Sequence, residues 1–464
     1  MAAFLWLLRA LGRGADCTLK GTFPMAILDG SPSPTRRARL FAGVGAAAFA
    51  VAALVTGAGP ATADTVTDTI AVGSSPNGVA VTPDGSRAYV TNRTSGTVSV
   101  IDTATNTVVG APVPVGANPI GVAVTPDGSR AYVTSQSGGT VSVIDTATNT
   151  VVGAPVPVGA NPIGVAVTPD GSRAYIANWD SGTVSVIDTA TDTVATVPVG
   201  STPFGVAVTP DGSRAYITNQ STNSVSVIDT ATNAVAATVR VDEWPAGVAI
   251  TPDGARAYIT SFDGGTVSVI DTVTNTLAAT VPVDSQPYGV AITPDGSRAY
   301  VTNDGSGTVS VIDTATGTVA ATVPVGSDPV GVAVTPDGSR AYVANHGSGT
   351  VSVIAIEQAP TLTGTPAAGA VDQIYSHAFT VTGRPAPTVT VTAGTLPDGL
   401  TVSPEGVLSG TPTVGGRFEF TLTASNGIDQ DASLPVVLDI AVPATGPLGS
   451  LGSLGSVGSL TWTS

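Results

Sequence analysis

The sequence predicts an all-β chain: a seven-bladed β-propeller closed by an N-terminal strand, followed by a small Ig-like β-sandwich. Three observations carry this prediction. Val and Thr alternate with Gly and Pro punctuation along most of the chain, which is typical of strands and tight turns rather than helices. The phrase Thr-Pro-Asp-Gly recurs seven times at steps of 41 to 43 residues. The seventh repeat lacks a fourth strand, and an unpaired strand-like segment precedes the first repeat.

Each repeat contains four strand-like runs separated by turn residues. Pro83-Asp84-Gly85 suits a tight turn, since Pro fixes φ and Gly tolerates positive φ. Four-stranded units of about 40 residues are typical of propeller blades, whereas the coils of an open solenoid, the alternative, rarely hold four antiparallel strands. The runs of the first repeat are Gly78–Thr82, Arg87–Thr91, Thr97–Asp102 and Thr107–Val115.

The two ends of the repeat region complete each other. The last repeat stops after its third strand, Thr350–Ile356. The orphan segment Thr65–Val72 matches the fourth strand of other repeats, such as Thr193–Val199. Pairing between the orphan and the last repeat would close the ring and cover two sheet edges, so residues 64–356 are predicted to form the propeller.

The second strands carry a recognisable phrase. AYVTN (Ala88–Asn92), AYVTS (Ala131–Ser135) and AYITN (Ala215–Asn219) resemble the YVTN family of β-propeller repeats. The resemblance implies a seven-bladed propeller outside the cytoplasm, of the surface-layer or secreted type, and implies no single activity. The third and seventh repeats depart from it, with AYIAN (Ala174–Asn178) and AYVAN (Ala341–Asn345).

Residues 1–63 are predicted to be an export segment. Three arginines within residues 36–39 precede an apolar run, Leu40–Val55, and an Ala-Thr-Ala site before Asp64, which is typical of a secretory signal. A membrane anchor is the alternative, but the run is short and rich in Ala and Gly. A start at Met25 would give a signal of ordinary length. We expect a secreted or cell-surface protein with no stable membrane span after cleavage, exported by either the Sec or the Tat route.

The charge and the residue inventory exclude several functions. The formal net charge is −16, and it becomes about −20 when residues 1–63 are removed. A protein with this negative charge repels nucleic acids. Residues 64–356 contain no Lys, Cys or Met. They contain one histidine, His346, and one glutamate, Glu243. No catalytic residue, metal site or cofactor is therefore predicted. The turn acids, such as Asp84, are expected to hold their own turns, with Arg87 and its equivalents paired nearby, rather than to bind calcium.

The repeats differ from one another on one side only. The Thr-Pro-Asp-Gly and Asp-Thr-Ala-Thr turns barely change, whereas the second-to-third hairpins and the links between repeats vary freely. Because these pairs lie on opposite faces of an antiparallel sheet, we expect function on the varied face. Seven repeated tyrosines in the second strands are expected to pack in the core. The five other aromatics of this region fall in the variable loops: Trp179, Phe204, Trp244, Phe262 and Tyr288.

These five aromatics are predicted to bind a ligand or partner, because flat aromatic surfaces stack on sugars or anchor proteins. The alternative is that they fill the mouth of the channel or pack on neighbouring loops.

Residues 357–442 are predicted to form the β-sandwich, and residues 443–464 a flexible tail of Gly, Leu and Ser. Gln358–Pro366 is expected to be a link. Gly394–Gly427 resembles the Ig domains of bacterial surface proteins, near the cadherin-like group, which implies a spacer or adhesion module. The predicted strands are Ile374–Val381, Pro387–Ala393, Leu400–Val402, Arg417–Ser425 and Leu434–Val442.

The function we expect is non-catalytic binding or adhesion outside the cell, with a protein or glycan of the cell surface as partner. A structural, surface-layer-like envelope component is one alternative. A channel enzyme of the lactonase or quinone-dependent dehydrogenase type is the other. The preference for Arg over Lys indicates a GC-rich bacterial source.

Overall fold

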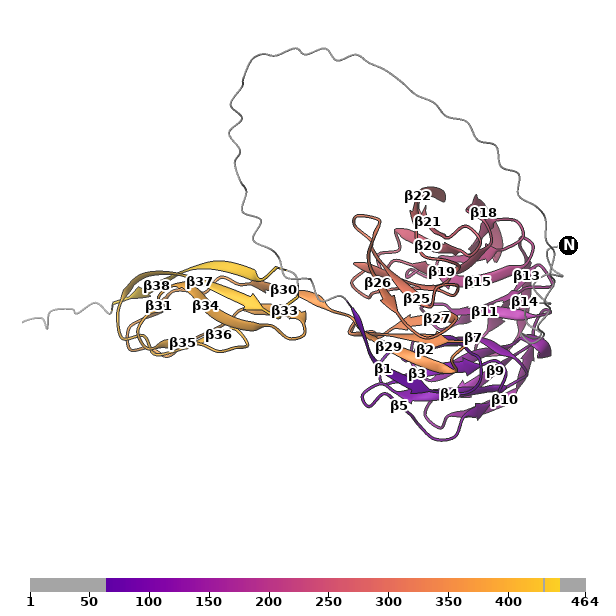
Figure 1. The fold of residues 1–464 in the computed structure, drawn as a ribbon, viewed down its shortest axis with the longest axis horizontal. Coiled ribbons are helices and arrows are strands. Elements are labelled where there is room, and N and C mark those ends of the chain that lie inside the picture. Colours follow the sequence, from indigo (N-terminus) through magenta and orange to yellow (C-terminus); the bar gives the residue numbers. More distant parts are fainter. Residues whose placement is uncertain (1–63, 429, 443–464) are drawn as a thin grey trace, which may run out of the picture. The chain divides into compact units, whose positions relative to one another are not determined.

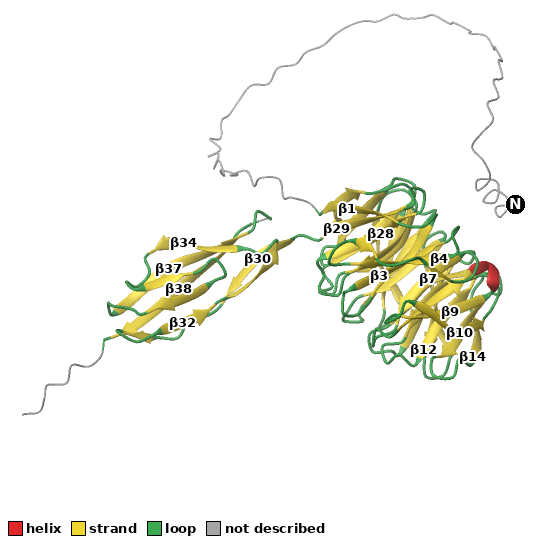
Figure 2. Cartoon of the chain, turned by 90° about the horizontal axis from the view of Figure 1, so that it is seen from below, coloured by secondary structure: helices red, strands yellow, loops and turns green. Residues whose placement is uncertain are grey.

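The structure is a computed structural model that describes residues 64–428 and 430–442. The predicted export segment and tail lie outside these residues. Within them the chain is built from strands, with one short 3-10 helix at Gln136–Gly138 (Figures 1 and 2). None of the described residues forms a helix of the length and apolar character needed to cross a membrane.

Residues 64–356 form repeated antiparallel sheets, in most of which four consecutive strands pair in chain order, while the last sheet takes β1 as its outer strand. The first strands are β2 (Pro76–Val81), β7 (Pro119–Val124), β11 (Pro162–Val167), β15 (Pro203–Val208), β19 (Pro245–Ile250), β23 (Pro287–Ile292) and β27 (Pro329–Val334). The second strands are β3 (Arg87–Asn92), β8 (Arg130–Ser135), β12 (Arg173–Asn178), β16 (Arg214–Asn219), β20 (Arg256–Ser261), β24 (Arg298–Asn303) and β28 (Arg340–Asn345).

The remaining two strands of each sheet lie beyond these. The third strands are β4 (Thr97–Asp102), β9 (Thr140–Asp145), β13 (Thr183–Asp188), β17 (Ser224–Asp229), β21 (Thr266–Asp271), β25 (Thr308–Asp313) and β29 (Thr350–Ala355). The fourth strands are β5 (Thr107–Val108) with β6 (Val113–Pro114), β10 (Thr150–Pro157), β14 (Val194–Pro198), β18 (Ala234–Arg240), β22 (Thr276–Pro282), β26 (Thr318–Pro324) and β1 (Thr65–Ala71). The first of these was expected as one run. It is split in two, with Gly110 at a φ of 67° between the halves.

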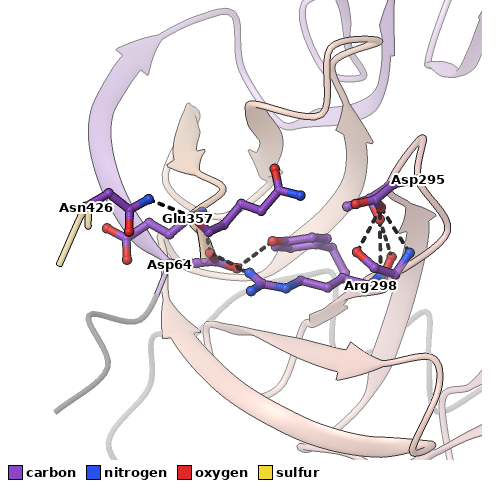
Figure 3. A network of polar contacts seen from close by, with 9 residues as sticks. Asp64, Asp295, Arg298, Glu357 and Asn426 are labelled. Atoms are coloured by element: carbon purple, nitrogen blue, oxygen red, sulfur yellow. Dashed lines mark hydrogen bonds and ion pairs between the residues drawn. The ribbon is translucent and has the colours of Figure 1, made fainter. Parts of the chain in front are cut away.

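The start of the repeat region joins its end. Strand β1 pairs antiparallel with β29, with Thr65 opposite Ala355. The Asp64 carboxylate is buried and accepts hydrogen bonds from Arg298 Nη1 at 3.0 Å, Tyr300 Oη at 2.5 Å and the Glu357 backbone N–H at 2.9 Å (Figure 3). These partners lie more than 230 residues away in the chain, so the contacts fix β1 on the last sheet.

The core consists of separate apolar clusters, each shared by two consecutive sheets. In one of them Tyr216 and Val227 pack against Ile259 and Ile270 of the next sheet. All seven repeated tyrosines are at most 1% exposed, which confirms the packing role predicted for them. The hydroxyl of Tyr216 also donates to Asn275 Oδ1 of the next sheet at 2.9 Å. No sheet therefore has a complete core of its own.

The first strands of consecutive sheets approach each other closely. A Cβ on Gly205 would lie 2.4 Å from the carbonyl oxygen of Ala246 in the next first strand, so only glycine fits. Thr218 bridges the same two strands: its hydroxyl donates to the Ala246 carbonyl at 2.7 Å and accepts the Gly205 N–H at 2.7 Å. The third and seventh repeats have Ala177 and Ala344 at the threonine position. The first strands of these two repeats therefore lack this bridge to the first strand of the neighbouring sheet.

Residues 358–441 form a second all-β body with its own core. Its strands are β30 (Gln358–Thr363), β31 (Gly369–Ala370), β32 (Tyr375–Ala378), β33 (Thr380–Arg384), β34 (Thr388–Gly394), β35 (Leu400–Val402), β36 (Val407–Gly410), β37 (Gly416–Ser425) and β38 (Ala432–Ala441). They form three sheets, ordered β30-β33, β31-β38-β37-β34 and β32-β36-β35. The core includes Phe379, Leu408, Phe420 and Leu438.

Two expectations for this body were wrong. Gln358–Pro366 was predicted to be a link, but most of it is strand β30, which pairs with β33 and places Leu362 in the core. Ile374–Val381 was predicted as one strand. It divides into β32 and β33 at Phe379, whose ring is buried in the core.

Candidate functional site

The repeated sheets have two chemically different ends. One, which we call the turn side, carries the Thr-Pro-Asp-Gly turns and the turns between third and fourth strands. The other, the loop side, carries the second-to-third hairpins and the links between sheets. The strands alternate in direction, so all turns of one kind lie at one end of their sheet.

The turn side repeats one set of local contacts. Asp211 accepts hydrogen bonds from the Thr209 hydroxyl at 2.5 Å and the Ser213 backbone N–H at 3.0 Å. These bonds hold the pKa of Asp211 at about 2. These contacts agree with the prediction that the aspartates stabilise their own turns.

The arginines of these turns do not pair with the turn acids, contrary to our expectation. Arg214 Nη1 donates to the carbonyl oxygen of Thr272 in the next sheet at 2.5 Å, and Arg340 reaches Thr103 in the same way. The turn aspartates are already occupied by Thr, Ser and backbone donors. Within residues 64–356 the one ion pair joins Arg298 to Asp64. Six of the seven turn arginines thus reach a neighbouring sheet, Arg87 being the exception among the described residues.

Two shallow clefts lie on the turn side, between neighbouring sheets. Their volumes are about 300 and 280 Å³. Asp211, Arg214 and Asp253 line the first, and the equivalent residues of two other repeats line the second. Both clefts are lined mainly by residues of the repeated turns, so neither has a set of side chains that distinguishes it as a specific binding site. Among the described residues no group of three or more His, Cys, Asp or Glu could hold a metal ion.

On the loop side, one position directly after each second strand is different in nearly every repeat. Its backbone N–H donates to the residue before the first-strand proline, as Trp179 does to the Asn161 carbonyl at 2.9 Å and Asp304 to the Gln286 carbonyl at 2.9 Å. All seven side chains are half-buried or buried. We call them the rim residues: Arg93, Gln136, Trp179, Gln220, Phe262, Asp304 and His346.

Side-chain contacts join rim residues of consecutive repeats. Arg93 Nη2 donates to Gln136 Oε1 at 3.1 Å, and Trp179 Nε1 donates to Gln220 Oε1 at 2.9 Å. Gln220 is only 4% exposed. Four of the seven rim residues therefore form two side-by-side pairs.

Three of the five predicted aromatics come together, and we call them the aromatic trio. The rings of Phe204 and Tyr288 meet edge to face with centroids 5.5 Å apart, and those of Phe262 and Tyr288 are 6.1 Å apart. Phe204 and Tyr288 were expected in loops, but they are the second residues of β15 and β23. The intervening repeat has the small Ala246 at that position, which leaves room for the two larger rings to meet.

The two tryptophans do not join these ring contacts. Trp179 is tied to Gln220, and Trp244 precedes Pro245 with a φ of 55°. Such a left-handed conformation is strained for a bulky residue, and the Trp244 N–H is held by Asn223 Oδ1 at 3.0 Å. All five aromatics are half-buried. The rings thus pack partly on their neighbours, as the alternative interpretation expected, and do not form one flat exposed patch.

Charged groups adjoin the trio. Burial and the nearby Asp328 raise the pKa of Asp304 to about 6. Burial and Arg93 lower the pKa of His346, whose Nδ1 is buried without a hydrogen-bond partner. Sequence reasoning had not singled out Asp304 or Arg93. Aligning the repeats would have found them, since they share the position of Trp179 and Phe262.

Comparisons with known proteins divide the chain in the same way. The family described as "Putative Ig domain" matches residues 351–441. A solved chain of Kuenenia stuttgartiensis hydrazine synthase, a β-propeller-containing protein, is similar with a TM-score of 0.57 and 27% sequence identity, over 61% of this chain and 96% of that one. No curated protein matches the sequence. The chain is therefore similar to a β-propeller-containing protein and, over residues 351–441, to an Ig domain family.

Proposed function

We propose that residues 64–356 form a seven-bladed β-propeller of the YVTN type, closed by β1, and that it is a non-catalytic binding or adhesion protein acting outside the cell. Contacts that run from each sheet to the next, and from the last to the first, support the closed ring. Gly331 approaches the Asn77 carbonyl as Gly205 approaches that of Ala246, and Arg340 reaches Thr103. The similarity to hydrazine synthase favours the same fold.

One observation carries the binding proposal: seven equivalent rim positions hold six residue types, while the turns at the opposite end repeat. A rigid scaffold with one diversified end is typical of recognition proteins. If the export signal expected in residues 1–63 functions, this end lies outside the cell, and the Ig-like body would serve as a spacer.

The partner is a protein or glycan rather than an enclosed small molecule. Phe204, Tyr288 and Phe262 fill the space between them with their own rings. Half-buried aromatics of this kind act as anchors in surface recognition, where a few central residues supply most of the binding energy.

A pull-down with purified residues 64–464 against cell-wall glycans and secreted proteins tests this function. We expect a saturable partner whose capture is lost in the Trp179→Ala, Phe262→Ala double variant. The control is Val273→Ala on the turn side, where the side chain is 79% exposed. Circular dichroism would verify the fold of both variants. Equal capture by all three proteins would refute a loop-side site.

A structural envelope component is the second candidate, and the outer strands favour it. Val235, Leu277 and Val319 occupy the same position of three fourth strands and are 37–46% exposed. Apolar, nearly uncharged edge strands can pair with other chains. Self-assembly of the purified protein without any partner would support this candidate over binding.

A further inference from the structure

The carboxylate of Asp304 is the one rim charge without a counterpart. Among residues 64–428 and 430–442 no side chain or backbone group forms a hydrogen bond or ion pair with it. It is half-buried, and Asp328 lies close enough to raise its pKa. The one charged rim residue of opposite sign, Arg93, is hydrogen-bonded to Gln136 instead. Placing a carboxylate here costs folding free energy that nothing in the described chain offsets.

The surroundings of Asp304 suit a cation with an apolar stem. Asp304 follows β24 in the sheet whose first strand carries Tyr288, and its backbone N–H donates to the Gln286 carbonyl, two residues before Tyr288, at 2.9 Å. Phe262 occupies the equivalent rim position of the preceding sheet. Tyr288 in turn contacts Phe204 and Phe262. An ammonium or guanidinium group beside a carboxylate and over aromatic rings gains both ion pairing and cation–π attraction.

The loop side as a whole carries a net negative charge, which suits a cationic partner. Its acidic residues outnumber its arginines, which are Arg93 and Arg240. The repeated arginines are all on the turn side, where acidic residues are also in excess but most of them are hydrogen-bonded within their own turns. Excess negative charge on one side attracts basic partners and speeds their association. The acidic residues of the loop side are Asp180, Asp242, Glu243, Asp263, Asp284, Asp304 and Asp328.

We propose that Asp304 and the aromatic trio form a subsite for an Arg or Lys side chain, supplied by a basic segment of a partner protein. The carboxylate pairs with the cationic head, and the rings of Tyr288 and Phe262 cover the stem. This inference rests on the proposed loop-side function and names the partner's chemistry. It favours a basic protein partner over a neutral glycan, because a glycan can only donate hydroxyl hydrogen bonds to Asp304, whereas an Arg or Lys side chain also neutralises its charge.

Titration calorimetry with a hexa-arginine peptide at physiological salt tests the subsite. We expect Asp304→Asn to weaken binding about tenfold, as removal of one partner of a desolvated charge pair does. Asp180→Asn makes the same charge change on the same side but away from the trio, and should weaken binding less than about twofold because exposed charges are screened. Equal losses in the two variants would overturn the subsite, since the peptide would then respond only to overall charge.

The pull-down distinguishes failure of this inference from failure of the proposed function. If Asp304→Asn captures the natural partner normally while the Trp179→Ala, Phe262→Ala variant does not, the loop side binds and the cation subsite is wrong. If no loop-side variant alters capture, the proposed function is wrong. Loss of the partner in both variants supports both proposals.

Discussion

At the scale of single residues, the threonine of the second strand explains why its motif repeats. Thr218 donates to a carbonyl of the next sheet and accepts an N–H of its own sheet, and it is fully buried. Four other repeats form the same pair of contacts, through Thr91, Thr134, Thr260 and Thr302. One hydroxyl thus satisfies two buried backbone groups at the narrowest approach of the strands.

Thr218→Ala should lower the free energy of unfolding by about 1–3 kcal/mol, because it leaves the Ala246 carbonyl and the Gly205 N–H unpaired. Ala177→Thr should raise it by about 0.5–1.5 kcal/mol, since the equivalent space in five repeats holds a threonine. Urea unfolding of both variants measures this, with the exposed Thr94→Ala as control. A neutral Thr218→Ala would show that the bridge adds no stability.

Asp304 predicts a pH-dependent stability effect. Its pKa is about 6 in the folded protein against 3.8 normally, so the folded state holds the extra proton between these values. Stability supplied by the neutral carboxyl is therefore lost as the pH rises from about 4 to 6. Burial and the neighbouring carboxylate of Asp328 are the causes of this raised pKa.

Asp304→Asn should stabilise the protein by about 1 kcal/mol at pH 7, a value discounted for the part of the carboxyl that stays in solvent. The gain should disappear near pH 4, where the native carboxyl is already neutral. Thermal unfolding of both proteins from pH 4 to 8 measures it. A gain of the same size at both ends of the range would mean that titration of Asp304 is not its cause.

At the scale of elements, β1 is attached to the last sheet both by its pairing with β29 and by the contacts of Asp64, the residue before it. The Asp64 carboxylate accepts hydrogen bonds from Arg298, Tyr300 and the Glu357 backbone N–H at the same time (Figure 3). In four other repeats the tyrosine hydroxyl donates to an asparagine in a turn of the next sheet, as Tyr216 does to Asn275. Asp64 takes that role where the last repeat has no such turn.

Asp64→Ala should cost about 3–5 kcal/mol, because it leaves Arg298 charged and partly buried without a partner. Asp68→Ala on the same strand is the control, since Asp68 is exposed. Chemical unfolding compares them. If the two variants were equally stable, the Asp64 contacts would not be what holds β1.

Sequence reasoning located the repeats, their turns and the orphan strand because each leaves a local pattern. It could not place Arg214 on Thr272, or Phe204 against Tyr288, because those contacts join residues of different repeats. It placed Phe204 and Tyr288 in loops because the variable stretch extends into the start of the first strand. It missed β30 because Pro360 and the alternating threonines are as typical of a linker as of a strand.

At the scale of the whole molecule, the hydrophobic core of the Ig-like body and those of the repeat region share no residue. The Ig-like body has one cluster around Leu438, and the repeat region has clusters that each join consecutive sheets. Since every sheet shares its core with its neighbours, the repeats should unfold together. The two bodies should unfold separately.

Leu438→Ala should therefore lower one of two calorimetric transitions, with a cost of about 2–5 kcal/mol, and leave the other in place. Ile228→Ala should lower the other transition alone. Both side chains are fully buried. A single transition that moves with either substitution would show that the two bodies unfold as one.

The two alanines in place of bridging threonines mark where the repeat array is weakest. Without a hydroxyl at Ala177 and Ala344, the amides of Gly164 and Gly331 have no threonine acceptor, unlike Gly205. Their amide protons should exchange with deuterated water sooner than those of the bridged glycines. Local opening should therefore begin at these two seams, which separate a block of three repeats from one of four, before the repeats unfold together.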